Sequence, residues 1–301
     1  MINLKTNIPS DFFNEEERSG FVISRQMKEI WAVELDLLAE FQRVCKANSI
    51  NYIASGGTML GAARHGGFIP WDDDIDIMMS RTDYSKLLSL SKEFKLPYFL
   101  QTYQNDKGFF RCFARLRNSL TTAIQNTEKD CHFRYNQGIF IDIFPMDNLI
   151  DDEQLLKKQS KKALHLLKKA LFYSSFQSRY YEDKNIMKKV IRHRFSRVLP
   201  LRGQDLRYLE LFDKECQKYN SAETEKVSLL SFQFNNRGHD ILRKDLSRTV
   251  DMDFEFLKIP VPSDYDRLLT HKYGDWKTPS KMPSYHGEIF FDTDKSFTHY
   301  I

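Results

Sequence analysis

The chain has 301 residues, of which 41% are hydrophobic and 29% are charged, and its formal net charge is +4. This composition excludes a disordered or collagen-like chain, and the length allows one or two folded domains. No apolar run approaches the roughly 18–20 residues that cross a bilayer, and Glu15, Glu16 and Glu17 stand where a signal peptide would be apolar. The four cysteines form no C-x-x-C pair, which argues against a disulfide framework and a paired zinc site. We therefore expect a cytoplasmic protein.

The first half of the sequence alternates between helical and extended patterns. Apolar residues recur at helical spacing over residues 24–48, with Ser24 as the N-cap, and a short strand at 51–55 ends at a glycine pair. A strand at 75–79 precedes a helix that begins near Thr82, and residues 98–125 alternate in the manner of strands. A further strand at 138–144 is expected to stop at Pro145. These elements predict an α/β catalytic core over residues 1–150.

The second half is more helical and more basic. Helices are predicted at 152–176, 185–198 and 204–219, within a basic helical lobe over residues 151–235. Residues 157–207 contain fifteen Lys or Arg and three acids, a net charge of +12; since the whole chain carries +4, the remainder carries −8. This asymmetry predicts an anionic partner near the basic segment, and no nucleic-acid-binding motif accompanies it.

The C-terminal segment, residues 236–301, returns to an extended pattern. It contains a β-like stretch near residues 254–261, a short helix at 263–272 and a loop with prolines, and we expect it to pack back onto the core. The predicted fold class is therefore α/β (α+β), a mixed sheet with flanking helices and a helical insertion.

Candidate functional side chains are most concentrated in the sequence IPWDDDIDI at residues 69–77. On a strand Asp74 and Asp76 point to the same face, whereas Ile75 and Ile77 face the core. Asp142 repeats this pattern in the strand at 138–144, and if the two strands are neighbours the three carboxylates form one cluster. Such all-oxygen ligands suit Mg²⁺ or Mn²⁺, which neutralise charge at a phosphoryl group.

Other interpretations of the aspartate run remain. A solvated acidic turn is one, and the Asp-x-Asp motif of metal-dependent glycosyltransferases is another. An EF-hand is excluded, because its sixth position requires Gly but is Ile77 and its twelfth requires Glu but is Asp83.

A glycine-containing loop, GGTMLGAAR, stands at residues 56–64 upstream of these acids. It matches neither the P-loop, because Ala62 and Ala63 follow Gly61, nor the dinucleotide fingerprint G-x-G-x-x-G. A strand, a Gly-Gly turn, a short helix and a strand with Asp-x-Asp is the order of elements in nucleotidyltransferases. There, the glycine turn and the following helix N-terminus receive phosphate oxygens through backbone N–H groups.

The sequence resembles the LicD family in three places. The string GTMLGAARH at residues 57–65, followed by FIPWDDDIDI at 68–77, is the most specific match, and GIFIDIFPMD at 138–147 and YGDW at 273–276 resemble two further motifs of the family. That family contains bacterial phosphocholine transferases and the glycan-modifying fukutin and fukutin-related enzymes. The cysteine-rich metal loop of the fukutin type is absent here, so no zinc is implied.

The resemblance implies a nucleotidyltransferase-like fold and a metal-dependent phosphotransferase. The implied substrates are CDP-choline, or CDP-ribitol or CDP-glycerol as alternatives, and a hydroxyl of a cell-surface glycan such as teichoic acid, capsule or lipooligosaccharide, and CMP is released. Asp74 and Asp76 would hold the metal, and Asp142 would complete the coordination and accept the proton of the acceptor. A true nucleotidyltransferase that releases pyrophosphate and a non-catalytic glycan- or membrane-binding protein are the alternatives.

The remaining site residues are predicted to bind the donor. They are glycine-loop residues, basic side chains, aromatic side chains and one acid that orients the loop: Gly56, Gly57, Thr58, Arg64, His65, Arg115, Arg117, Trp71, Tyr273, Trp276 and Asp72. The aromatic residues have core packing as their alternative role, and the arginines a solvated strand face. The lysines of the helix at 152–176 are explained either as a solvated helix face or as a contact with a lipid-linked acceptor at the anionic inner face of the membrane.

Overall fold

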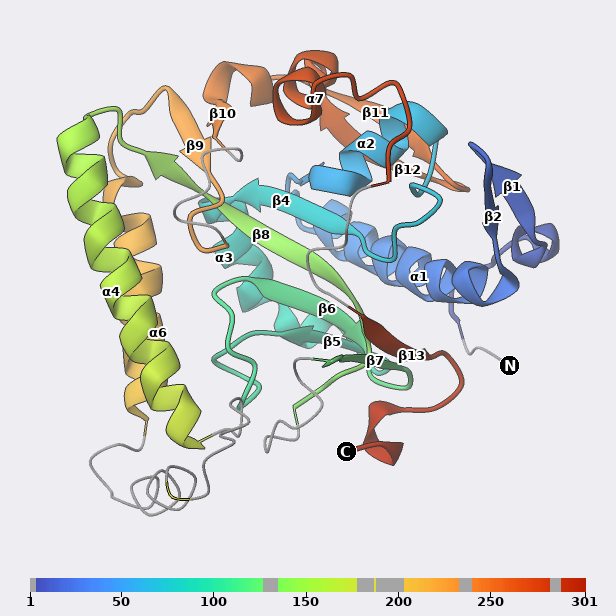
Figure 1. Ribbon diagram of the computed structural model, residues 1–301, viewed down its shortest axis with the longest axis horizontal. Coiled ribbons are helices and arrows are strands. Elements are labelled where there is room, and N and C mark those ends of the chain that lie inside the picture. Colours follow the sequence, from blue (N-terminus) through green and yellow to red (C-terminus); the bar gives the residue numbers. More distant parts are fainter. Residues whose placement is uncertain (1–3, 127–134, 178–186, 188–202, 233–239, 282–287) are drawn as a thin grey trace.

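A computed structural model describes residues 4–126, 135–177, 187, 203–232, 240–281 and 288–301. Its helices are α1 Arg25–Ala47, α2 Gly56–His65, α3 Arg81–Ser89, α4 Glu153–Gln177, α6 Gln204–Cys216 and α7 Tyr265–Tyr273. Its strands are β1 Glu16–Arg18, β2 Phe21–Ile23, β3 Ile53–Ala54, β4 Asp76–Ser80, β5 Tyr98–Gln101, β6 Ala114–Asn118, β7 Thr122–Gln125, β8 Ile139–Leu149, β9 Lys226–Ser228, β10 Ile241–Leu242, β11 Thr249–Phe254, β12 Leu257–Pro262 and β13 Ile289–Asp292. The mixed sheet with flanking helices confirms the predicted fold class (Figure 1).

The long strand β8 organises the central sheet. One edge of β8 pairs in parallel with β4, and the other edge pairs antiparallel first with β6 and then with β9. The strands β3, β5 and β10 extend the sheet from β4, β6 and β9 respectively. Because β8 is in the middle of the sheet, side chains on it are held by neighbours on both edges.

The prediction that Pro145 ends this strand is wrong, since β8 continues to Leu149. The amide of Asp142 donates to the carbonyl of Ile75 next to β4, so the position of Pro145, three residues on, faces the opposite edge. On that edge the pairing with β6 ends at Ile143 and the pairing with β9 begins at Asp147. The missing N–H of Pro145 therefore falls in the gap between two partners, where no ladder hydrogen bond is lost.

Helix α1 supplies much of the main core. Its N-cap is Ser24, as predicted, whose hydroxyl accepts a hydrogen bond from the amide of Met27 at 3.2 Å. One stripe of the helix, including Trp31, Leu38 and Phe41, is buried against the sheet. Both α1 and α3 lie behind the central strands in Figure 1.

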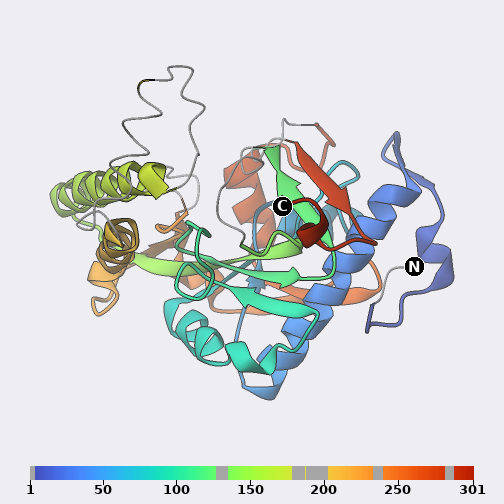
Figure 2. The same cartoon turned by 90° about the horizontal axis from the view of Figure 1, so that it is seen from below.

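Helices α4 and α6 pack side by side at one end of the sheet, away from α1, as Figures 1 and 2 both show. A separate small core fills the space between them and includes Ala163, Leu209 and Phe212. The helix predicted at 185–198 lies outside the described residues. Among the described helices, none is long and apolar enough to cross a membrane.

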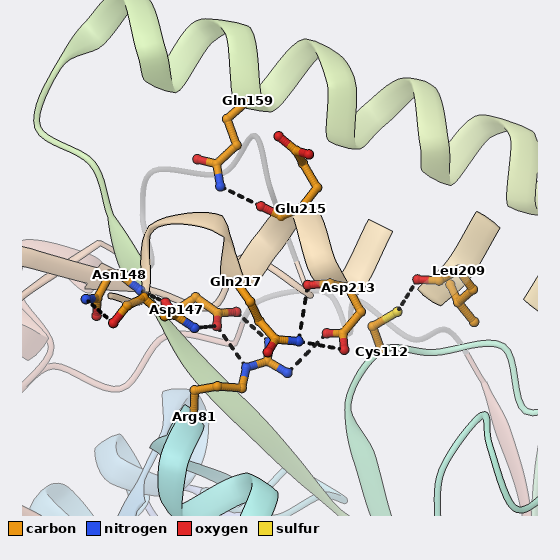
Figure 3. A network of polar contacts seen from close by, with 10 residues as sticks. Arg81, Cys112, Asp147, Asn148, Gln159, Leu209, Asp213, Glu215 and Gln217 are labelled. Carbon is orange, nitrogen blue, oxygen red and sulfur yellow. Dashed lines mark hydrogen bonds and ion pairs between the residues drawn. The ribbon is translucent and has the colours of Figure 1, made fainter. Parts of the chain in front are cut away.

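An ionic network joins α6 and α3 to the sheet (Figure 3). Arg81, the first residue of α3, donates to both carboxylate oxygens of Asp147 on β8, at 2.8 and 2.6 Å, and to Asp213 on α6 at 3.1 Å. The two carboxylates raise the pKa of Arg81 above its already high ordinary value, so it remains charged. Asn220 donates to Asp147 and Gln217 to Asp213, which leaves both acids well hydrogen-bonded. The network fixes the end of β8 that lies away from Asp142.

The C-terminal segment contacts the first half of the chain through several elements. Strands β11 and β12 form a hairpin whose Phe254 ring lies 4.8 Å from that of Phe68, and β13 pairs antiparallel with β7. Glu255, which follows β11, forms an ion pair with Arg18 at 2.8 Å. These contacts place α7 beside α2, the helix that begins with the glycine pair.

Candidate active site

Two of the predicted acids meet on the central strands. Asp76 on β4 and Asp142 on β8 are partners in the parallel register, so their side chains project from the same face of the sheet on adjacent strands. Ile75 and Ile77, which alternate with the acids, are fully buried. The strand with Asp142 therefore lies beside the strand that begins at Asp76, and this adjacency was the condition for a shared carboxylate site.

The glycine pair lies directly against these acids. Gly56 has a positive φ of 52°, and a Cβ placed on it would lie 3.1 Å from Oδ2 of Asp76. A Cβ on Gly57 would lie 2.5 Å from Oδ2 of Asp72, closer than real Cβ contacts allow. The hydroxyl of Thr58 accepts a hydrogen bond from the amide of Asp76 at 2.8 Å. The glycines are thus required because two carboxylates approach the N-terminus of α2.

Arg115 on β6 binds Asp142 from the other side. Its Nε and Nη2 donate to the two carboxylate oxygens at 2.6 and 3.3 Å, and its guanidinium lies 3.7 Å from the centroid of the Phe140 ring. Both members of the pair are buried, at 3% and 8% exposure. Arg115 was predicted to contact the donor, but in the structure it orients the acid that faces Asp76.

The electrostatics of the site are strongly negative. Burial raises the pKa of Asp76 well above its ordinary value, and the neighbouring Asp74, Asp142 and Asp72 raise it further, whereas Lys272 lowers it. Carboxylates held near one another in this way bind a proton or a cation to reduce their repulsion.

Glu34 is an acid in this region that the sequence analysis missed. It is 1% exposed on α1, and its Oε2 has no hydrogen-bond partner among the described residues. Burial raises its pKa well above the ordinary value, and Asp74 and the other acids of the aspartate run add to the shift. The signal was available, because Glu34 is three residues after Trp31 and four before Leu38, on the apolar stripe of the helix.

The carboxylate oxygens of the site suit a hard divalent cation that also binds to the substrate. Among the described residues, no three acid, imidazole or thiol groups are arranged to enclose a metal ion by themselves. Mg²⁺, however, is commonly bound by one or two carboxylates together with substrate phosphates and water. Asp76 and Asp142 on facing positions, with Asp74 two residues before Asp76, supply oxygens of this kind.

Arg64 and His65 form a separate group at the other end of α2, about 12 Å from Gly56 along the helix axis. Arg64 donates to Nε2 of His65 at 2.9 Å and to the carbonyl oxygen of Trp276 at 2.8 Å. Burial lowers the pKa of His65 to about 4, and the charges of Arg64 and Arg18 contribute. The structure thus joins these two residues to Trp276, and not to the acids.

The remaining predicted residues have diverse surroundings. Arg117 is wholly buried and donates to Gln101 and to the carbonyl oxygen of Gly138 at 2.5 and 2.6 Å, which favours a structural role. The Trp71 ring packs 4.5 Å from that of Phe21. Tyr273 is 38% exposed, whereas Trp276 is 7% exposed with its indole nitrogen unpartnered among the described residues.

Trp31, which sequence analysis assigned only to the core, also supports the acidic loop. Its indole nitrogen donates to the backbone carbonyl oxygen of Asp72 at 2.8 Å, and its ring stacks on Phe68 at 4.6 Å between centroids. A buried side chain of α1 therefore fixes the backbone of the loop that carries the acids.

Comparisons with known proteins agree with this site. The family model described as the nucleotidyltransferase domain of LicD, FKTN and FKRP matches residues 49–168, which include the glycine pair, the aspartate run and Asp142. The chain is 25% identical over 261 residues to the lipopolysaccharide cholinephosphotransferase LicD of Haemophilus influenzae, covering 83% of this chain and 91% of that protein.

Two eukaryotic proteins match over shorter regions. Human ribitol 5-phosphate transferase FKRP is 53% identical over 34 residues, which are 11% of this chain and 7% of that protein. Mannosyltransferase regulator 4 of Saccharomyces cerevisiae is 32% identical over 111 residues, 36% of this chain and 9% of that protein. Residues 49–168 of this chain thus match the nucleotidyltransferase domain of the LicD family, and the similarity to LicD of Haemophilus influenzae extends over most of the chain.

Proposed function

We propose that this protein is a LicD-type phosphotransferase that moves a phospho-alcohol, phosphocholine in the first instance, from a CDP-activated donor to a hydroxyl of a cell-surface glycan. The observation that carries the proposal is the pair Asp76 and Asp142 on facing strands, against the Gly56–Gly57 turn, inside the family domain. The name of the Haemophilus influenzae relative supports choline as the alcohol and a lipopolysaccharide as the acceptor.

The residues of the site have two roles, binding the CDP-activated donor and activating the hydroxyl of the acceptor. Asp74, Asp76 and Asp142 would hold Mg²⁺ or Mn²⁺, which when bound neutralises charge on the donor phosphates. The first amides of α2, which begins at Gly56 and has no side-chain N-cap, would bind phosphate oxygens. Asp142, oriented by Arg115, takes the proton of the attacking hydroxyl, since each of its oxygens keeps a second acceptor position beside the Arg115 hydrogen bond.

The attack occurs at the phosphorus that bears the alcohol. The new bond joins this phosphorus to the acceptor oxygen, the bond to the bridging oxygen breaks, and CMP leaves with the electron pair. A second candidate is transfer of ribitol phosphate or glycerol phosphate from the corresponding CDP-alditol, which the short match to ribitol 5-phosphate transferase FKRP favours.

The test is release of CMP from CDP-choline, CDP-ribitol and CDP-glycerol, with Mg²⁺ or with EDTA. Asp76→Asn should lower turnover by a factor on the order of 10²–10⁴, because a negative ligand at the reacting phosphate is lost. Asp73→Asn is the matched control and should retain most of the activity, because Asp73 lies in the loop before β4, outside the register that pairs Asp76 with Asp142. Pyrophosphate release from CTP and a phospho-alcohol would instead identify a nucleotidyltransferase, and no CMP from any donor would contradict the proposal.

The exposed lysines of α4 are relevant to how the protein would reach its glycan acceptor. Lys157, Lys158, Lys161 and Lys168 are exposed, and Leu171 and Phe172 near the end of the helix are 49% and 57% exposed. Lys162 is different, because it forms an ion pair with Glu215 on α6 at 2.6 Å. A basic helix face with exposed apolar residues suits peripheral contact with an anionic membrane that carries a lipid-linked acceptor.

A further inference from the structure

Lys272, on α7 in the C-terminal segment, brings a positive charge to the glycine turn. Its Nζ would lie 3.7 Å from a Cβ placed on Gly56, and Oδ2 of Asp76 would lie 3.1 Å from the same point. A cation from the C-terminal segment and an anion from the central sheet therefore approach the same glycine from different elements. Both charges lie at the N-terminus of α2.

The Lys272 ammonium lacks hydrogen-bond and ion-pair partners among the described residues. Its Nζ lies 5.3 Å from the centroid of the Tyr273 ring. The side chain is half-buried, and burial lowers the pKa of Lys272 while Asp76 raises it. An ammonium group has three donors, and withdrawing it from water without partners is unfavourable, so an anionic ligand at the turn would satisfy it.

We propose that Lys272 binds a phosphate oxygen of the donor's diphosphate over the Gly56–Gly57 turn. This inference rests on the proposed function, because it assigns a phosphate-binding residue to the same site. The ammonium and the first amides of α2 would bind the phosphates on one side, and the carboxylates would hold the metal on the other. Lys272 lies outside residues 49–168, so the C-terminal segment completes a donor site that the family domain alone does not contain.

Calorimetric titration of the full chain with CDP in Mg²⁺, and with cytidine, tests this assignment. Lys272→Met should bind CDP about 10- to 100-fold more weakly, the usual effect of losing one hydrogen bond to a charged group. Lys272→Arg should restore most of the affinity, because it keeps the charge. Lys46→Met removes an exposed lysine at the far end of α1 and should bind CDP like the parent. Cytidine has no phosphate, so its affinity should be the same in all four proteins.

The outcomes separate this inference from the proposed function. If the parent binds CDP and Lys272→Met binds it equally well, the inference is wrong and the proposed function stands. If the parent does not bind CDP in Mg²⁺, the proposed function is wrong and the inference with it. Thermal melting reports whether each variant folds; if Lys272→Met is unstable, CDP binding by Lys272→Gln decides, and parent-like affinity there overturns the assignment.

Discussion

Replacing Asp76 or Asp142 with Asn should change the stability of the protein in opposite directions. The two carboxylates occupy facing positions on adjacent parallel strands, where backbones are about 4.8 Å apart. Two negative charges about 5 Å apart repel by roughly 3 kcal/mol at an effective dielectric constant of about 20. Either substitution relieves this repulsion, but only Asp142 is paired with a buried guanidinium, that of Arg115. The ion pair with Arg115 is therefore the main difference between the two variants, beside the charges of Asp74, Asp72 and Lys272 around Asp76.

The size of the expected stability difference follows from the burial of the ion pair between Arg115 and Asp142. Removing one partner of a buried ion pair costs about 3–5 kcal/mol, and Asn keeps one acceptor oxygen, so we expect a difference of about 3 kcal/mol. Asp76→Asn should gain about 1 kcal/mol over the parent, because the substitution removes the repulsion from the neighbouring carboxylates together with the attraction of Lys272. At about 2 °C per kcal/mol for a chain of this size, Asp76→Asn should melt about 2 °C above the parent and Asp142→Asn about 4 °C below it.

The assay is thermal melting in EDTA at pH 8 and low salt, so that no cation offsets the repulsion. A second melt with Mg²⁺ and CDP should raise the melting temperature of the parent and have a smaller effect on Asp76→Asn, since ligands stabilise the state they bind. Equal shifts for the two variants in EDTA would show that Arg115 does not stabilise Asp142. A lower melting temperature for Asp76→Asn would show that this carboxylate is not held against other negative charges.

Three further changes have expected outcomes. Glu34→Gln should flatten the pH dependence of the free energy of unfolding. The raised pKa of Glu34 makes its protonated form the stable one, so its contribution to stability is full below pH 4.5 and is lost as the pH rises toward the folded-state pKa. Gln avoids this loss, and chemical denaturation from pH 4 to 9 would measure the difference. Gly57→Ala should reduce CMP release strongly, because its Cβ displaces the Asp72 carboxylate, whereas Gly66→Ala, with no atom near its Cβ, should affect melting more than turnover; equal turnover losses would contradict this. Replacing Lys157, Lys158 and Lys161 with Gln should weaken binding to anionic liposomes by about 3 kcal/mol at low salt and leave donor hydrolysis unaffected. Unchanged sedimentation with liposomes would exclude the membrane contact.

Local patterns in the sequence were sufficient to predict the main elements and the acids. Alternation around Asp76 predicted a half-buried strand and the same pattern at Asp142 predicted its neighbour, whereas Asp74 precedes the strand, which begins at Asp76. The glycine pair was predicted to receive phosphate oxygens of a ligand, and in the structure the carboxylates of Asp72 and Asp76 lie against it. The strand predictions succeeded because period-two alternation depends on nearest neighbours along the chain.

The partners of these residues depended on the tertiary structure. Strand order places Arg115 against Asp142, helix packing buries Glu34 beside the aspartate run, and the C-terminal segment brings Lys272 to Gly56 from more than 200 residues away. The same holds for Pro145, which a central strand accommodates because two different strands share one of its edges. Local periodicity was sufficient to place Asp76 and Asp142 on strands, because alternation depends only on neighbours along the chain. Charge pairing, burial and the resulting pKa shifts were decided only by the fold, because they arise from contacts between segments that no local pattern connects.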